Sequence, residues 1–195
     1  MLNVKVTRRP VLVEAIWPQA SLLSQIALVL VGSWLIALTA RLQIPLWPVP
    51  ITGQTFAVLL IGALLGSKRG ALSMLAYLSQ GLAGLPFFAQ GSAGPARLLG
   101  PTGGYLVGML VAAYAVGWLC ERGWDRRLMS AFLAMLIGTA CIYACGLVWL
   151  AYFVGWPSVL SAGLLPFIPG DLLKIVLAAL LLPQGWALLH RLSLR

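Results

Sequence analysis

The chain has 195 residues, of which 61% are hydrophobic and only 9% are charged. A soluble domain carries about 25% charged residues, so this composition excludes a soluble enzyme, and it equally excludes a disordered chain. The formal charge is +9, but the basic residues fall in short clusters between long apolar runs. That distribution indicates membrane topology rather than nucleic-acid binding.

Six apolar runs are candidate membrane helices, because about 20 mostly apolar residues are needed to span a bilayer. The second run is shorter than the others and opens on the polar stretch ITGQT, and the last is interrupted by Pro166, Pro169, Pro183 and Gly185. The pattern predicts an all-α membrane protein, a compact bundle of six transmembrane helices. In chain order the runs are Ala20–Ala40, Ile51–Gly66, Gly70–Ala89, Gly103–Cys120, Leu128–Gly155 and Leu164–His190.

The domain organisation and orientation follow from the same runs and the charges between them. We expect one membrane domain over residues 1–195, with a short N-terminal segment at 1–19. Ten of the 13 basic residues lie at the two termini or in the loops after the second and fourth runs, whereas only Arg41 and Arg97 lie on the other side. Since Lys and Arg favour cytoplasmic loops, both termini are predicted to lie in the cytoplasm of a multi-pass protein of the inner (plasma) membrane.

The three loops on the other side are nearly uncharged and rich in Pro and Gly. Non-helical backbone near membrane depth is tolerated where it is buried in protein or lines a cavity. These loops are therefore predicted to cover an outward-facing pocket, with stiff ordinary connectors as the alternative. They are IPLWPVPITGQ, QGSAGPARLLGPTGG and GWPSVLSAGLLPFIPG.

The last run carries the sequence PGDLLK, which contains the best candidates for a binding site. Asp171 stands in the first turn after Pro169 and Gly170, where an acid suits the helix dipole, and Lys174 follows three residues later on the same face. Ionisable groups inside a membrane segment indicate function by default. The pair offers an acceptor and a donor to a polar ligand, or else only neutralises itself between helices.

Further candidates come from the remaining polar and aromatic residues. Arg97 is the basic residue in a Gly- and Pro-rich outer loop, and its planar guanidinium can donate two parallel hydrogen bonds to a carboxylate. The alternative is a solvated loop arginine. Gln54 and Gln80 are polar groups in apolar surroundings, each either a ligand contact or an interhelical hydrogen bond. The aromatic candidates for an apolar pocket wall are Trp47, Tyr77, Phe87, Phe88, Tyr105, Tyr143 and Trp156.

Catalytic and metal-binding motifs are missing from the sequence. It has no GxSxG, HExxH or P-loop pattern, its one histidine is His190, and its three cysteines are interpreted as packing residues. No catalytic residue, metal or cofactor is therefore predicted. The residues alone favour an outward-facing binder of a small, anionic solute without its own energy source. A self-sufficient secondary carrier and, less favoured, a small membrane enzyme acting on lipid are the alternatives.

Three motifs, in this order and spacing, resemble the BioY family, the biotin-specific S components of energy-coupling factor (ECF) transporters. They are VPITGQTFAVLLIGALLG (49–66), LLGPTGGYLVG (98–108) and PGDLLK (169–174). The resemblance covers most of the chain. It implies a six-helix bundle that captures external biotin beneath its outer loops, in a cell membrane, for vitamin uptake, with biotin as the transported substrate and no cofactor.

The resemblance also implies site residues and partners. Asp171 and Lys174 would contact the ureido ring or the carboxylate of biotin, Arg97 would lie near the valerate carboxylate, and Gln80 would add a polar contact. The implied partners are a membrane T component and cytoplasmic ATPase subunits, in the lipid bilayer, with docking through small residues of the first helix. The candidates for that docking are Ala20 with Ser24 and Ser33 with Ala37.

Overall fold

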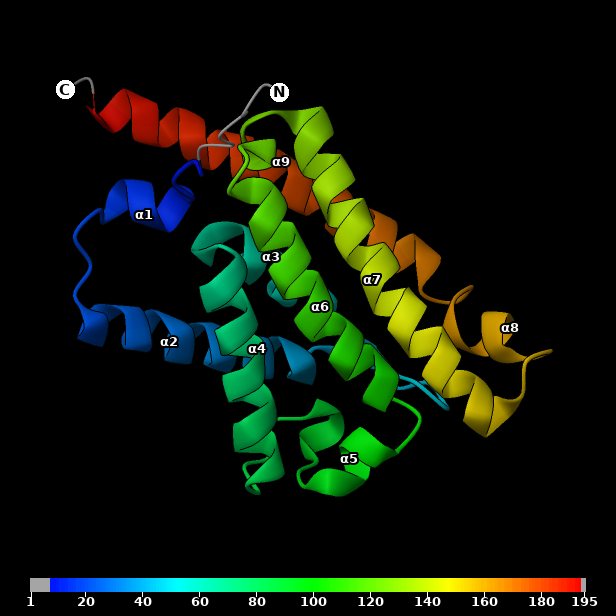
Figure 1. The fold of residues 1–195 in the computed structure, drawn as a ribbon. Coiled ribbons are helices and arrows are strands. Elements are labelled where there is room, and N and C mark those ends of the chain that lie inside the picture. Colours follow the sequence, from blue (N-terminus) through cyan, green and yellow to red (C-terminus); the bar gives the residue numbers. More distant parts are fainter. Residues whose placement is uncertain (1–7, 194–195) are drawn as a thin grey trace, which may run out of the picture.

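The computed structural model describes residues 8–193, so Lys5 and Arg195, counted above among the basic residues, lie outside the described residues. Helices dominate the described part, and α6 packs against α3, α4 and α7 (Figure 1). The elements are α1 (Leu12–Ile16), α2 (Leu22–Arg41), β1 (Gln43–Ile44), β2 (Ile51–Thr52), α3 (Gln54–Leu65), α4 (Ser67–Leu82), η1 (Ala89–Gly91), α5 (Pro95–Leu99), α6 (Gly103–Cys120), η2 (Trp124–Arg126), α7 (Leu128–Val154), α8 (Val159–Gly163) and α9 (Ile168–Ser193).

Each of the six predicted apolar runs overlaps a helix: α2, α3, α4, α6, α7 and α9. Four of them, α2, α6, α7 and α9, are long and apolar enough to cross a membrane. The helix α3 has 12 residues and α4 has 16, which at about 1.5 Å per residue is less than a hydrocarbon core of about 30 Å. The fold is therefore that of a mostly helical, multi-pass membrane protein.

The helix α9 runs through Pro183 and Gly185 without a break. We expected these residues to interrupt the last run, because Pro lacks an N–H group and clashes with the preceding turn. That prediction is wrong within the helix. Neighbouring helices stabilise such a proline in membrane proteins, and α9 packs along α7 and α3. Pro169 lies in the first turn of α9, where the missing N–H group has no partner to lose.

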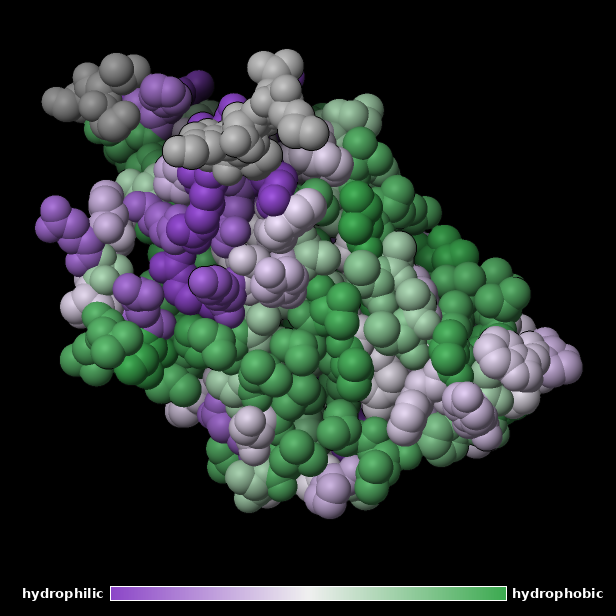
Figure 2. Space-filling view, viewed as in Figure 1, coloured by the Kyte–Doolittle hydropathy of each residue, from purple (hydrophilic) through white to green (hydrophobic). Residues whose placement is uncertain are grey.

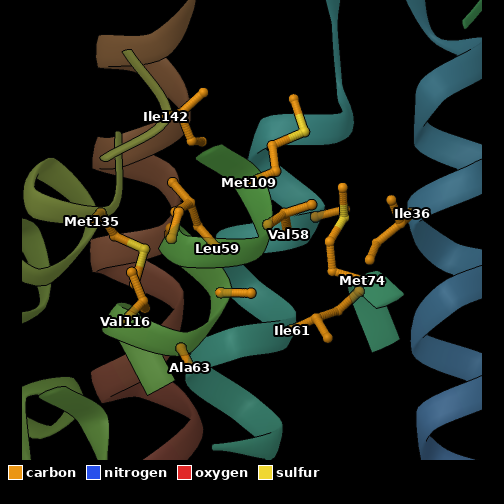
Figure 3. Packing of buried hydrophobic residues seen from close by; sticks show 14 of the residues in the cluster. Ile36, Val58, Leu59, Ile61, Ala63, Met74, Met109, Val116, Met135 and Ile142 are labelled. Carbon is orange, nitrogen blue, oxygen red and sulfur yellow. The ribbon is translucent and has the colours of Figure 1, made fainter. Parts of the chain in front are cut away.

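Small residues let the central helices approach closely. A Cβ atom on Gly62 of α3 would lie 2.5 Å from the carbonyl oxygen of Ala113 in α6, and one on Gly108 of α6 would lie 2.8 Å from that of Ile142 in α7. Such contacts are typical of helix association in membranes. Around them, Leu59 of α3, Val116 of α6 and Met135 of α7 converge in the buried core (Figure 3).

The face of α2 that packs on α3 and α4 carries Ser33 and Ala37, both buried. The prediction that this pair serves as a docking surface is therefore wrong for the structure described, since the core already covers both side chains. Ala20 precedes α2, and Ser24 lies partly exposed in its first turn. The opposite face of α2 exposes large apolar side chains: Leu22, Leu23, Ile26, Leu30, Val31, Trp34, Leu35 and Leu38.

The two ends of the molecule differ in structure. The loops that the sequence left irregular form a small β1–β2 hairpin, η1, α5 and α8, and in Figure 1 α5 and α8 lie far from α1. We call the end with these loops the cavity end. The opposite end, with α1, η2 and the last turns of α9, we call the basic end. Its described bases are Arg8, Arg9, Lys68, Arg69, Arg122, Arg126, Arg127 and Arg191.

Candidate functional site

A cavity opens at the cavity end, with about 630 Å³ of empty space between its lining residues, including the solvent at its mouth. Its wall is built from α3, α4, α6, α7 and α9, and from the two loops that precede α3 and α6. Most of the wall is apolar or aromatic. Three charged side chains line it, those of Arg97, Asp171 and Lys174, and all three were predicted site residues.

Asp171 and Lys174 form an ion pair in the wall of the cavity. The turn at Pro169 and Gly170 starts α9, and the amide of Asp171 donates to the carbonyl of Phe167 at 2.9 Å. One turn of helix then places the Lys174 ammonium 3.0 Å from Asp171 Oδ1. The side chain of Asp171 is only 10% exposed and that of Lys174 only 19%. The pair therefore lies in a region of low dielectric, where its hydrogen bonds are strong.

Lys174 also joins α9 to the ITGQT segment. Its ammonium donates to the carbonyl oxygen of Thr52 at 2.8 Å and to Thr55 Oγ1 at 3.0 Å. On the other side of the pair, the hydroxyl of Tyr143 in α7 donates to Asp171 Oδ2. The pair therefore holds together three elements far apart in the sequence. The sequence predicted the pair but gave no signal for Thr52 and Thr55 as its partners.

Arg97 lies on α5, in the loop predicted to hold it, and reaches the cavity. Its Nη2 atom is buried, and no hydrogen-bond acceptor contacts it within residues 8–193. Burial lowers the pKa of the guanidinium, although an arginine stays charged at neutral pH. A buried donor without an acceptor is costly, and a carboxylate is the kind of group that would supply the missing acceptor.

Gln54, the first residue of α3, is a second side chain with an unused donor. It is 3% exposed and lines the cavity. Its Nε2 atom makes no hydrogen bond of normal geometry in the described part of the chain, although it lies close to the hydroxyl of Tyr77. Its backbone amide is held by Thr52 Oγ1 at 3.3 Å. The sequence marked Gln54 as one of two polar groups in apolar surroundings, but did not distinguish its environment from that of Gln80.

Gln80 is not among the residues that line the cavity. Its Nε2 atom donates to Ser33 Oγ at 3.0 Å, and its Oε1 atom accepts from Trp34 Nε1 at 3.1 Å. Both partners belong to α2, so the side chain makes the interhelical hydrogen bonds that were the alternative interpretation. The structure does not bring Gln80 together with Arg97, Asp171 and Lys174.

Aromatic side chains form much of the remaining wall. Of the seven predicted candidates, four line the cavity: Tyr77, Phe88, Tyr105 and Tyr143. Tyr105 packs edge-on against Tyr143 with ring centroids 6.3 Å apart, and its hydroxyl donates to the carbonyl of Gly163 at 2.8 Å. Trp47 and Trp156 are exposed instead, and Phe87 lies in a separate apolar groove beside α2.

No group of three or more His, Cys, Asp or Glu side chains in residues 8–193 could hold a metal ion. The three cysteines are free thiols. The cavity therefore offers an ion pair, an unpaired guanidinium, an amide and aromatic walls. This arrangement suits binding of a small ligand that has an apolar body, a polar head and a carboxylate.

Comparisons with known proteins identify relatives of this chain. Residues 10–191 match the model of the BioY family. The probable biotin transporter BioY of Pyrococcus horikoshii is 40% identical over 80% of this chain and 93% of its own length. The biotin transporter BioY2 of Lactococcus lactis is 33% identical over 90% of this chain and 95% of its own length.

The fold has a counterpart among solved structures. The crystal structure of the S-component for biotin from an ECF-type ABC transporter superposes with a TM-score of 0.73 at 28% identity, covering 83% of this chain and 90% of that one. Fold and cavity define a multi-pass membrane protein that binds a small solute. The chain belongs to the BioY family. Its relatives are transporters, and it is accordingly a transport protein and not an enzyme.

Proposed function

We propose that this chain is the substrate-binding S component of an ECF transporter and captures external biotin for uptake across the membrane. The observation that carries the proposal is the cavity in which Asp171, Lys174 and the unpaired donor of Arg97 meet aromatic walls. Biotin has the matching chemistry: a ureido ring with donors and an acceptor, an apolar chain, and a terminal carboxylate. Homologues named as biotin transporters support the same substrate.

Each charged residue has a chemical role in this proposal. The Asp171 carboxylate accepts hydrogen bonds from the ureido N–H groups. The Lys174 ammonium donates to the ureido oxygen in exchange for one of its three bonds to Thr52, Thr55 and Asp171, which use all of its N–H groups. Arg97 binds the carboxylate through two parallel N–H groups. Gln54 supplies the additional amide contact for which Gln80 was the candidate, because its free Nε2 atom lies in the cavity wall and that of Gln80 is used elsewhere.

The topology that goes with this function has six membrane-spanning helices and both termini in the cytoplasm of a plasma-membrane protein. In it the short helices α3 and α4 complete the bundle, and the cavity opens outward. The charge distribution between loops supports this orientation. Reporter fusions at Arg69 and Arg126 should read cytoplasmic, and one at Gly94 external. An external reporter at the C-terminus would contradict the orientation.

The proposal includes partners, a membrane T component and cytoplasmic ATPase subunits. The sequence contains no P-loop, and the loops between membrane helices at the basic end are too short to hold an ATPase domain. In liposomes the protein alone should bind biotin without concentrating it, and adding both kinds of partner should confer ATP-dependent uptake. Accumulation by the lone protein on a proton gradient would instead establish the secondary carrier.

A further inference from the structure

A second hollow, at the basic end, has about 1,350 Å³ of empty space and lies between the α1–α2 segment, the start of α4 and the end of α6. We call it the basic groove. Figure 2 shows hydrophilic side chains gathered over α1 and the start of α4, next to apolar surface. The charged and aromatic residues that line the groove are Arg8, Glu14, Trp17, Lys68, Arg69, Tyr114, Trp118 and Glu121.

Two of the three lining bases are used within the protein. Arg8 lies 2.8 Å from Glu14 and 3.3 Å from Glu121, and Arg69 also pairs with Glu14. Glu121 in addition accepts from the amide and the hydroxyl of Ser67, both at 2.9 Å. Both carboxylates of the groove are therefore neutralised by partners of their own, and they do not cancel further positive charge.

Lys68 is the third basic residue that lines the groove. Its side chain is exposed, and no ion pair or hydrogen bond joins it to another residue within 8–193. It lies in the first turn of the 16-residue helix α4, whose macrodipole favours an anion, although the amide of Ser67 is already bound by Glu121 and that of Gly70 by Gly66. An unpaired ammonium and a helix start thus share one edge of the groove.

A second cation, Arg122, is not a lining residue but lies on Trp118, which lines the groove. The guanidinium of Arg122 stacks on the ring of Trp118, 3.2 Å from its centroid, and donates to the carbonyl of Trp118 at 2.8 Å. No carboxylate among the described residues pairs with it. Lys68 in the groove and Arg122 next to it therefore give this region a surplus of positive charge beyond its internal ion pairs.

The surroundings of the groove are those of a membrane interface. Trp17, Tyr114 and Trp118 line it and are 51%, 50% and 43% exposed, and such aromatic side chains favour the headgroup level of a bilayer. The first turns of α2 expose Leu22 and Leu23 beside it, at 75% and 77%. An occupant that fits both parts has an anionic head and an apolar tail.

We propose that the basic groove binds an anionic phospholipid. The phosphate lies against Lys68, with Arg122 on the neighbouring Trp118 adding positive charge, and the acyl chains follow the exposed start of α2. A basic pocket between membrane helices suits such headgroups, with about 1 kcal/mol for each base near the surface. The site is independent of the biotin cavity at the other end of the molecule.

Native mass spectrometry of the delipidated, detergent-purified protein tests the proposal. Phosphatidylglycerol should bind more tightly than phosphatidylcholine with the same chains, and salt should weaken only the former because it screens charge. Lys68→Gln should reduce phosphatidylglycerol affinity about fivefold. The matched control is Arg127→Gln, an exposed base of the same end outside the groove, which should leave the affinity unchanged.

Thermal unfolding of each variant verifies that the fold is retained, so a loss of lipid binding is not mistaken for unfolding. Equal affinity of the wild-type protein for the two lipids, or equal losses in the two variants, would overturn the proposal. Ala20, a candidate contact for the T component, itself lines the groove. If Lys68→Gln abolishes binding of that partner and leaves the lipid affinity unchanged, the groove belongs to the protein partner and not to lipid.

Discussion

At the cavity end, Arg97 and Gln54 each hold a buried donor that no described residue satisfies, whereas at the basic end the carboxylate of Glu121 accepts from Ser67 and Arg8. Both regions bury charged or polar groups in a largely apolar protein. At the cavity end this hydrogen-bonding capacity is left open toward a cavity. At the basic end the Glu121 carboxylate is used between helices, and the one open atom there is Oδ1 of Asp125, whose Oδ2 accepts from Trp186, within residues 8–193. Removing a side chain should therefore affect ligand binding in the first region and stability in the second.

The Asp171–Lys174 pair stands between these two cases, and breaking it should have the largest effect. Lys174→Ala removes the partner of a buried carboxylate and the tether to Thr52 and Thr55. The free energy of unfolding should fall by about 3 kcal/mol. Biotin affinity should also fall by roughly 10- to 150-fold, as expected for a hydrogen bond to a charged group. Equilibrium unfolding and biotin titration measure the two effects.

The milder change Asp171→Asn keeps the shape of the side chain and serves as the comparison if Lys174→Ala does not fold. It should weaken biotin binding while the protein still unfolds cooperatively. Unchanged affinity in a folded Asp171→Asn protein would mean that the pair is purely structural, like the ion pairs of the basic end.

Arg97→Ala should separate binding from stability most cleanly. Because the Nη2 atom has no partner in the described chain, its removal should leave the unfolding temperature nearly unchanged. Biotin affinity should fall by roughly 10- to 150-fold, and affinity for biotin amide, which lacks the carboxylate, by much less. Arg127→Ala, at the basic end, is the control. Equal losses for biotin and its amide would remove Arg97 from the carboxylate role.

Glu121→Gln should give the opposite result, a change in stability without a change in binding. Burial would raise the pKa of Glu121, but hydrogen bonds from Ser67 and from Arg8 outweigh it and hold the pKa below its ordinary value. The stabilisation is therefore present at neutral pH and is lost as the pH falls below about 4.3 through the lowered pKa.

The variant should lose about 1.5–3 kcal/mol at pH 7, and its unfolding temperature should depend less on pH between 5 and 3 than that of the wild type. Thermal unfolding across this range checks both points. A variant with the same pH dependence as the wild type would show that Glu121 does not carry the proposed stabilisation.

The smallest effects should come from the two glutamines. Gln80→Ala should cost about 0.6 kcal/mol of stability, the average for a hydrogen bond between membrane helices, and leave biotin affinity unchanged. Gln54→Ala should weaken binding and leave the unfolding temperature nearly unchanged. Titration and unfolding of both variants make a matched pair. The reverse result would return Gln80 to the binding site and make Gln54 a packing residue.

The helices could be predicted from the sequence because a membrane helix requires a long apolar run. The observed starts of α6 and α7 coincide with the starts of the predicted runs. It was wrong about the interruption of α9 at Pro183, because local propensity does not include support from α7 and α3. The short helices α5 and α8 and the β1–β2 hairpin are too short for a periodic pattern of apolar residues to predict them.

The site was predictable where a residue is chemically unusual in its surroundings. Asp171, Lys174 and Arg97 are ionisable groups in apolar segments, and the structure places all three in one cavity. Gln54 and Gln80 resemble each other in sequence, and only the packing of α2 against α4 shows that Gln80 has partners. The direction in which a side chain faces depends on how neighbouring helices pack against each other. That packing cannot be read from a single sequence.

The central claim is that the cavity of this chain binds biotin. Its most direct test is an equilibrium titration of the purified wild-type protein with labelled biotin, with unlabelled biotin as competitor. The account predicts saturable binding of one biotin per chain, competed by biotin and weakened by Arg97→Ala. A cooperatively folded wild-type protein that shows no saturable biotin binding would contradict it.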